Sequence, residues 1–303
     1  MRASSRSGGS FPQAGALVSK GLSALGTSFR SGTFTSESPG GDNDNANYLN
    51  FISVMATEDA TQVIFDNLDK TLDLMSITSP PGTGTFSLTA QLERGQIYLI
   101  AAEADDAPAN RDGLIGVSIE SDRPIVVNTG SANGSFHNGG GRDYGIDQMV
   151  GADKIGDEYV FVKGNGENGW ENVLIVADED NTDVFLDDNP IPIINLAKAG
   201  DYYLIEGDAF SNAGSERTLY VSTSNNVFAW QGTGTGSEAN QGMFFVPPLS
   251  CQSQGEVNNI PQIDYIGSSL FSGFVTIVTN QTASVTFSDA NNTNKSADDS
   301  SFS

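Results

Sequence analysis

The chain has 303 residues, enough for about two domains of ordinary size. Hydrophobic residues make up 38% of it and charged residues only 17%, and 38 acidic against 14 basic residues give a formal net charge of −24. This acidity argues against nucleic acid and anionic membrane surfaces as partners, because both select clustered lysine and arginine.

Residues 1–13 are rich in serine, glycine and arginine, and they hold no apolar segment of the kind that a signal peptide needs. We expect a disordered or truncated lead-in here, in a chain that is a fragment of a larger protein. Ala16–Leu25 follows as the one helical candidate, about two turns long and interrupted by Gly21. Since no apolar run is long enough for a spanning helix, we expect no membrane insertion.

The rest of the chain consists mostly of short apolar runs rich in Val, Ile, Phe and Tyr, bounded by Gly, Asn, Asp or Pro. This pattern is typical of β-strands and predicts an all-β fold. In the first half we expect strands over residues 49–56, 61–66, 86–92, 96–102, 114–121 and 124–130. In the second half we expect them over residues 158–163, 171–177, 182–187, 191–196, 201–206, 217–222, 226–231 and 242–246.

The chain also repeats itself at a long period. Val54–Asp66 reads VMATEDATQVIFD, Ile175–Asp187 reads IVADEDNTDVFLD, and a weaker third copy over Ile277–Asp289 reads IVTNQTASVTFSD. Two further pairs of segments match, 92–102 with 196–207 and 119–130 with 221–232. We expect each to be two strands about a polar turn, so that one unit is about three hairpins with antiparallel neighbours.

The repeat divides the chain into tandem units. We expect a first β unit over residues 14–147, a second over 148–250, and a partial third unit with a polar tail over 251–303. The units are expected to be antiparallel and sandwich-like, or alternatively to close their hairpins into a propeller-like ring. We also expect the glycines that open the units to take a turn conformation that a Cβ would oppose: Gly26, Gly156 and Gly267.

An acidic turn is the strongest candidate for chemistry. The stretch DEDNTD places carboxylates at Asp178, Asp180 and Asp183, and Ca²⁺ takes several oxygen ligands of this kind. A structural calcium ion is therefore one hypothesis, and we expect no other cofactor. A plain turn is the alternative, because Asp and Asn favour turns for local reasons and the matching stretches in the other repeats lose most or all of these carboxylates.

No catalytic constellation emerges from the sequence, so we predict no catalytic residues and no enzyme activity. GNGENG (residues 164–169) matches the dinucleotide pattern formally, but it lies between two strands and not at the start of a helix. His137, the only histidine, sits in a glycine-rich loop, which would not hold the imidazole in place as a Ser-His-Asp triad requires. Cys251 is the only cysteine and is expected to be a small buried hydrophobe. Trp170 and Trp230 could stack on sugars or fill sandwich cores.

Several degenerate strings together resemble one known family: TEDATQV, DEDNTDV, SDRPIVVNTGS, GIDQMV and FVPPLSC. The chain is similar to the N-terminal-like region of IgGFc-binding protein, as found in large adhesin-like surface proteins of Bacteroidetes-type bacteria. The resemblance covers about residues 14–290. It implies an extracellular or cell-surface location and binding to an extracellular protein or glycan, and it brings no catalytic residues. Such proteins often carry a separate C-terminal sorting domain, and because neither this domain nor a signal peptide is found in the 303 residues, we expect the chain to be a fragment.

The first functional hypothesis is thus a non-catalytic extracellular binding or adhesion module. A carbohydrate-binding or carbohydrate-active domain is the alternative, and a structural spacer is the third. The sequence leaves the ligand-binding residues and the oligomeric state open.

Overall fold

The structure is a computed structural model, and it describes most of the chain up to residue 250 and short pieces beyond. The described residues are 2–6, 14–35, 49–103, 108–136, 143–164, 166–210, 217–234, 241–250, 265–266, 269–270, 277–279, 284–288 and 294–296. His137, Cys251, Gly267 and most of the predicted third unit lie outside them.

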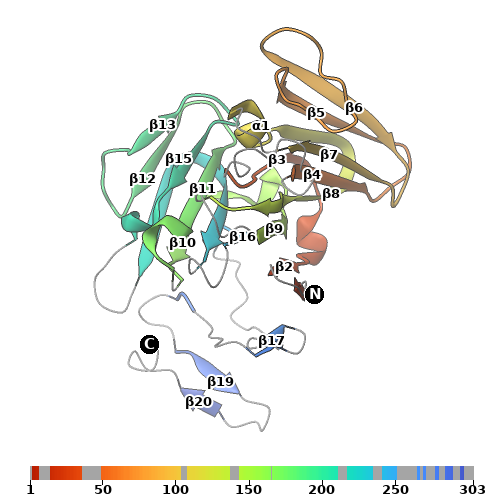
Figure 1. Cartoon of the computed structure of the whole chain (residues 1–303). Helices are drawn as coiled ribbons and strands as arrows, with labels where there is room; N and C mark the ends of the chain where they lie inside the picture. Colours follow the sequence, from red (N-terminus) through yellow and green to blue (C-terminus); the bar gives the residue numbers. More distant parts are fainter. Residues whose placement is uncertain are drawn as a thin grey trace.

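Two seven-stranded antiparallel sheets make up the body of the protein (Figure 1). The first, here called the first unit, contains β3 (Gly26–Arg30), β4 (Leu49–Ala56), β5 (Thr61–Asp69), β6 (Thr85–Leu92), β7 (Ile97–Glu103), β8 (Ser118–Gly134) and β9 (Asp143–Gln148). The second unit contains β10 (Gly156–Val162), β11 (Glu171–Ala177), β12 (Thr182–Leu186), β13 (Ile194–Leu196), β14 (Tyr202–Ile205), β15 (Thr218–Thr233) and β16 (Gly242–Phe245). The prediction of an all-β, sandwich-like fold is confirmed.

The two units share one topology. The strand order is β6-β5-β8-β4-β7 in the first and β13-β12-β15-β11-β14 in the second, with β3 and β9 added to β8, and β10 and β16 added to β15. Each strand of the first unit therefore has a counterpart seven places later in the second. The repeat in the sequence is thus a repeat of structure. The predicted boundaries at residues 14–147, 148–250 and 251–303 stay a prediction.

Each unit folds over on itself at one long, bent strand. The first part of β8 pairs with β3 and β5, and its second part pairs with β4 and β9. β15 pairs in the same way with β10 and β12, and then with β11 and β16. Each unit is therefore a sandwich of two four-stranded layers that share the bent strand.

The expectation of three hairpins per unit is wrong. SDRP (121–124) and TSNN (223–226) do not end a strand, because Ser121 Oγ donates to the Arg123 carbonyl at 2.7 Å and Thr223 Oγ1 to the Asn225 carbonyl at 2.7 Å, which bends β8 and β15 without breaking them. The acidic turn is not a hairpin turn either, since β4 pairs with β7 and β8 while β5 pairs with β6 and β8.

Smaller elements complete the described structure. The strands outside the two units are β1 (Arg2–Arg6), β2 (Ala14–Val18), β17 (Tyr265–Ile266), β18 (Ser269–Leu270), β19 (Thr286–Ser288) and β20 (Asn294–Ser296). The helical pieces are α1 (Pro108–Asp112) and the 3₁₀ turns η1 (Gly21–Ala24), η2 (Ala152–Lys154), η3 (Asn168–Trp170) and η4 (Gly207–Ala209).

Three expectations about these segments are corrected. The helix predicted over Ala16–Leu25 is the strand β2 followed by η1, because β2 pairs with β1. The strands β3 and β9 were not predicted. Gly26 and Gly156 open β3 and β10 without a positive φ, so the turn conformation is wrong. A Cβ is opposed there by crowding, at 2.8 Å from Gly151 Cα and 2.8 Å from Pro248 Cβ.

The core has two parts. One cluster fills the second unit alone. The larger cluster fills the first unit and also takes in one face of the second, namely Leu174, Val176, Phe228, Trp230, Met243 and Phe245. Burial of these six apolar side chains in a cluster shared with the first unit stabilises the contact between the units. The two units therefore form one packed body.

Candidate binding surface

The acidic turn of each unit is built by the same internal contact. Thr61 Oγ1 donates a hydrogen bond to the Glu58 carbonyl at 2.8 Å, and Thr182 Oγ1 donates to the Glu179 carbonyl at 2.8 Å. Both threonine side chains are fully buried. The threonine that recurs in the repeated motif is thus a structural residue in both copies.

The repeated aspartate fastens this turn to the next turn along the same edge. Asp180 Oδ1 accepts the Ala199 N–H at 2.9 Å, and its Oδ2 pairs with Lys198 Nζ at 2.9 Å. The Ala199 N–H and then the Lys198 ammonium lower the pKa of Asp180. In the first unit Asp59 Oδ1 accepts the Arg94 N–H at 3.1 Å. These carboxylates therefore link the β4–β5 and β11–β12 turns to the β6–β7 and β13–β14 turns.

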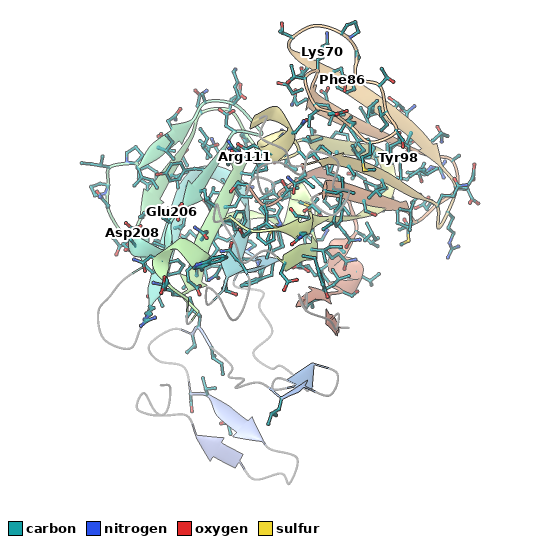
Figure 2. The ribbon with its side chains drawn as sticks, viewed as in Figure 1. Lys70, Phe86, Tyr98, Arg111, Glu206 and Asp208 are labelled. Atoms are coloured by element: carbon teal, nitrogen blue, oxygen red, sulfur yellow. The ribbon has the colours of Figure 1, made fainter. Side chains whose placement is uncertain are left out.

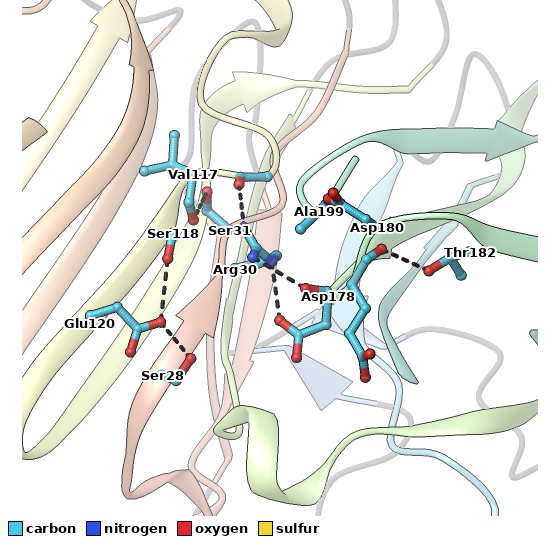
Figure 3. A network of polar contacts seen from close by, with 12 residues as sticks. Ser28, Arg30, Ser31, Val117, Ser118, Glu120, Asp178, Asp180, Thr182 and Ala199 are labelled. Atoms are coloured by element: carbon cyan, nitrogen blue, oxygen red, sulfur yellow. Dashed lines mark hydrogen bonds and ion pairs between the residues drawn. The ribbon is translucent and has the colours of Figure 1, made fainter. Parts of the chain in front are cut away.

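Asp178 links the two units (Figure 3). The Arg30 guanidinium of β3 donates through Nε to Asp178 Oδ1 at 3.1 Å and through Nη2 to the Asp178 carbonyl at 3.2 Å. Its Nη1 reaches the Gly116 carbonyl at 3.4 Å. Both side chains are largely shielded, so this pair is less screened than a surface ion pair.

The predicted calcium ligands each have a protein partner. Asp183 Oδ1 accepts from Asn195 Nδ2 at 2.8 Å, while Asp178 pairs with Arg30 and Asp180 with Lys198. Across the described ranges, no group of three or more His, Cys, Asp or Glu side chains is arranged to hold a metal. Calcium binding at Asp178, Asp180 and Asp183 stays a prediction.

Two glycines of the stretch GNGENG, Gly164 and Gly166, bind a carboxylate of the protein itself. Glu171 is fully buried, and its Oε2 and Oε1 accept the Gly164 and Gly166 N–H groups at 2.9 Å each. Burial raises the pKa of Glu171, against the opposing effect of N–H groups that include that of Gly234. The N–H groups of Gly164 and Gly166 are therefore occupied by Glu171.

The two tryptophans have different surroundings. Trp230 is fully buried, with its ring 5.4 Å from the Phe245 ring in an edge-on contact and 6.3 Å from the Phe228 ring in a stacked one. It is a core residue, as one of the two interpretations predicted. Trp170 is half-buried at the end of η3.

Two polar clusters join the first unit to its neighbours. Asp147 Oδ2 of β9 accepts from Lys20 Nζ at 2.7 Å and from the Phe245 N–H of β16 at 2.8 Å.

The second cluster involves α1, which Figure 2 shows, labelled at Arg111, between the two units. The hydroxyl of Tyr202 hydrogen-bonds to Asp112 of α1, and burial followed by this carboxylate raises the pKa of Tyr202.

One face of the first unit presents apolar side chains to solvent. On β4 the inward residues are buried, while Met55 between them is 37% exposed. On β7, Ile97 is 63% and Leu99 is 56% exposed. The ladder places Ile97, Met55 and Val126 in one row, and Leu99, Ser53 and Asn128 in the next. We call these six residues the exposed face.

The same face of the second unit is covered. Its rows are Tyr202, Val176 and Phe228, then Leu204, Leu174 and Trp230. All four residues from β11 and β15 are fully buried, and Tyr202 and Leu204 pack against the shared core. Because solvent rarely faces contiguous apolar side chains without a functional reason, the exposed face is the candidate binding surface.

This surface was not predicted from the sequence. Its signal is that FISVMA (51–56) and IYLIAA (97–102) carry apolar residues at outward positions, where a one-sided strand would alternate with polar ones. The strands were predicted, but the side of the sheet that would be covered was not.

Comparison with known protein families agrees with the resemblance that the sequence motifs indicate. A family model described as IgGFc binding protein matches residues 15–302. No curated protein and no solved structure matches the chain. In the part of the chain that the structure describes, no helix is long and apolar enough to cross a membrane.

Proposed function

The chain belongs to the IgGFc-binding protein family, and on that premise we propose that it is a non-catalytic extracellular module that binds other proteins, in adhesion at a cell surface. The observation that carries this proposal is the exposed face on β4, β7 and β8, which offers solvent a set of apolar side chains on a rigid sheet. Such a face can bury a protein partner's apolar residues with little loss of side-chain entropy.

Two further observations favour binding over catalysis. The buried Glu171 is engaged with loop N–H groups, and the buried Asp147 is engaged with Lys20 and Phe245. Both carboxylates thus serve the fold. The acidic turns, which carried the strongest chemical signal in the sequence, are likewise occupied by hydrogen bonds to neighbouring turns.

The experiment is a binding screen with the whole chain. The purified chain is incubated with arrays of extracellular proteins and of glycans. The Fc fragment of IgG is the first probe, because the family description names it. We expect protein hits that Leu99→Glu loses. The control is Leu22→Glu, since Leu22 lies on η1 outside the exposed face and is 84% exposed.

The outcomes separate the hypotheses. Protein hits that survive Leu99→Glu would overturn the assignment to this face. Hits on glycans alone would favour the carbohydrate-binding alternative. The absence of any hit would favour the structural spacer.

A further inference from the structure

The internal repeat indicates what covers the exposed face. In the second unit the same face, row for row, is buried against the first unit. We propose that the exposed face docks, head to tail, on the second unit of another copy of this chain. This inference rests on the proposed function and names the partner of the same surface.

The internal interface defines the surface on which such a face docks. A Cβ at Gly32 would lie 2.8 Å from the ring of Trp230, so the segment after β3 runs directly beneath this ring. Arg30 at the end of β3 pairs with Asp178 in the acidic turn of the incoming unit. The receiving surface is thus the end of a unit where β3 finishes and β8 begins.

The second unit has the corresponding end at the finish of β10 and the start of β15. The Lys163 N–H donates to the Arg217 carbonyl at 2.8 Å, two residues beyond Phe161 and Leu219, which correspond to Ser31 and Val117 of the first unit. Val162 and Lys163 are half-buried and Arg217 is exposed. We call these three residues the β10–β15 end.

The charges of the two surfaces are complementary. In the internal interface the receiving end supplies the cation Arg30, and the acidic turn supplies the anion Asp178. The acidic turn beside the exposed face carries Glu58 and Asp59, both exposed. The β10–β15 end supplies Lys163 and Arg217, two of only 14 basic residues in the whole chain. Opposite charges on the two surfaces favour this arrangement over a face-to-face one of two acidic turns. The Arg30–Asp178 pair itself is not reproduced, because Thr57 stands where the second unit has Asp178.

The proposed contact is weaker than the internal one and extends without closing. Ser53 and Asn128 stand where the second unit has Leu174 and Trp230, so less apolar area is buried. The face and the end lie on different units, so each copy offers one of each. A contact of this kind is heterologous and joins copies into a row.

The test is sedimentation velocity on the whole chain from micromolar to millimolar concentration. We expect reversible association whose midpoint moves by about tenfold or more in Leu99→Glu, which puts a charge in the face, and in Arg217→Glu, which reverses a charge at the end. Leu22→Glu should associate as the wild type does. Circular dichroism melts of all three variants confirm that each remains folded.

Mixing the two variants isolates the head-to-tail geometry. Leu99→Glu keeps an intact end and Arg217→Glu keeps an intact face, so an equimolar mixture should form a one-to-one complex that grows no further. A wild type that stays monomeric at millimolar concentration, or a mixture that forms no complex, overturns the inference. The proposed function is tested separately, because it falls if the binding screen returns no protein partner, whatever the association state of the chain.

Discussion

Gly116 and Gly200 meet backbone to backbone where the two units touch. A Cβ added to Gly116, whose φ is +76°, would lie 1.9 Å from the Gly200 carbonyl oxygen. Gly116→Ala must therefore strain the backbone and push the units apart, and we expect a loss of about 3 kcal/mol or more in the free energy of unfolding. Urea unfolding followed by tryptophan fluorescence measures it.

Gly95→Ala is the matched control for this change. Gly95 has a φ of +81°, but a Cβ there would meet nothing within 4 Å. It should cost only the conformational strain of about 1 kcal/mol. Equal losses in the two variants would show that the contact between the units does not limit stability.

The Arg30–Asp178 pair should couple the two units energetically. Both side chains are mostly shielded from solvent and the guanidinium also holds the Asp178 carbonyl. A double-mutant cycle of Arg30→Ala and Asp178→Ala should give a coupling of about 1 kcal/mol or more, above the value for an exposed pair. The exposed pair of Arg123 and Glu58, at 3.5 Å, provides the reference cycle. A coupling no larger than the reference would contradict this expectation.

Asp147→Ala should be among the most damaging single changes. It removes the partner of Lys20, whose pKa burial already lowers, and the acceptor of the Phe245 N–H. Since an uncompensated buried charge costs about 3–5 kcal/mol, a loss in that range is expected from calorimetric melting. Lys20→Met leaves Asp147 with its N–H donors and should cost clearly less. If Lys20→Met cost more than Asp147→Ala, the Asp147 carboxylate, and not the Lys20 ammonium, would be the charge that is more costly to leave buried without its partner.

The strands were predictable because their limits are local. Residues 49–56 and 171–177 were predicted with the bounds that β4 and β11 have, since polar residues and an acidic turn punctuate both. The sequence predicted two strands separated by a turn at Ser121–Pro124, where β8 is in fact continuous. This error could not be avoided, because the residues SDRP are typical of a turn. Pairing with strands of both layers keeps β8 continuous there.

The candidate surface depends on packing between units, which a strand pattern does not encode. ENVLIVA of β11 is apolar at outward positions and is covered on both faces. FISVMA of β4 is nearly as apolar, yet its outward Met55 faces solvent. In the two rows of this face, Ser53 and Met55 of β4 stand where β11 has Leu174 and Val176. Such differences acquire meaning once the repeat is seen in three dimensions.

The calcium prediction has a direct test. An ion held by Asp178, Asp180 and Asp183 would raise the melting temperature in calcium over that in EDTA. Because each of these carboxylates has a protein partner already, we expect the two melting temperatures to agree. A calcium-dependent rise that Asp183→Asn abolishes would establish the site instead.

Glu171→Gln should change how stability depends on pH. Burial raises the pKa of Glu171 in the folded chain above its ordinary value of 4.5, so the folded state binds more protons than the unfolded state between these two values. The free energy of unfolding of the wild type, relative to Glu171→Gln, should therefore fall as pH rises from about 4 through this window and then level off.

Urea unfolding of both chains over this pH range measures the difference. Glu167→Gln is the control, because it removes one carboxylate at an exposed position of the same loop and leaves the buried Glu171 unchanged. A relative stability that rises with pH would contradict the expected sign. It would mean that the N–H groups of Gly164, Gly166 and Gly234 stabilise the Glu171 carboxylate by more than burial penalises it.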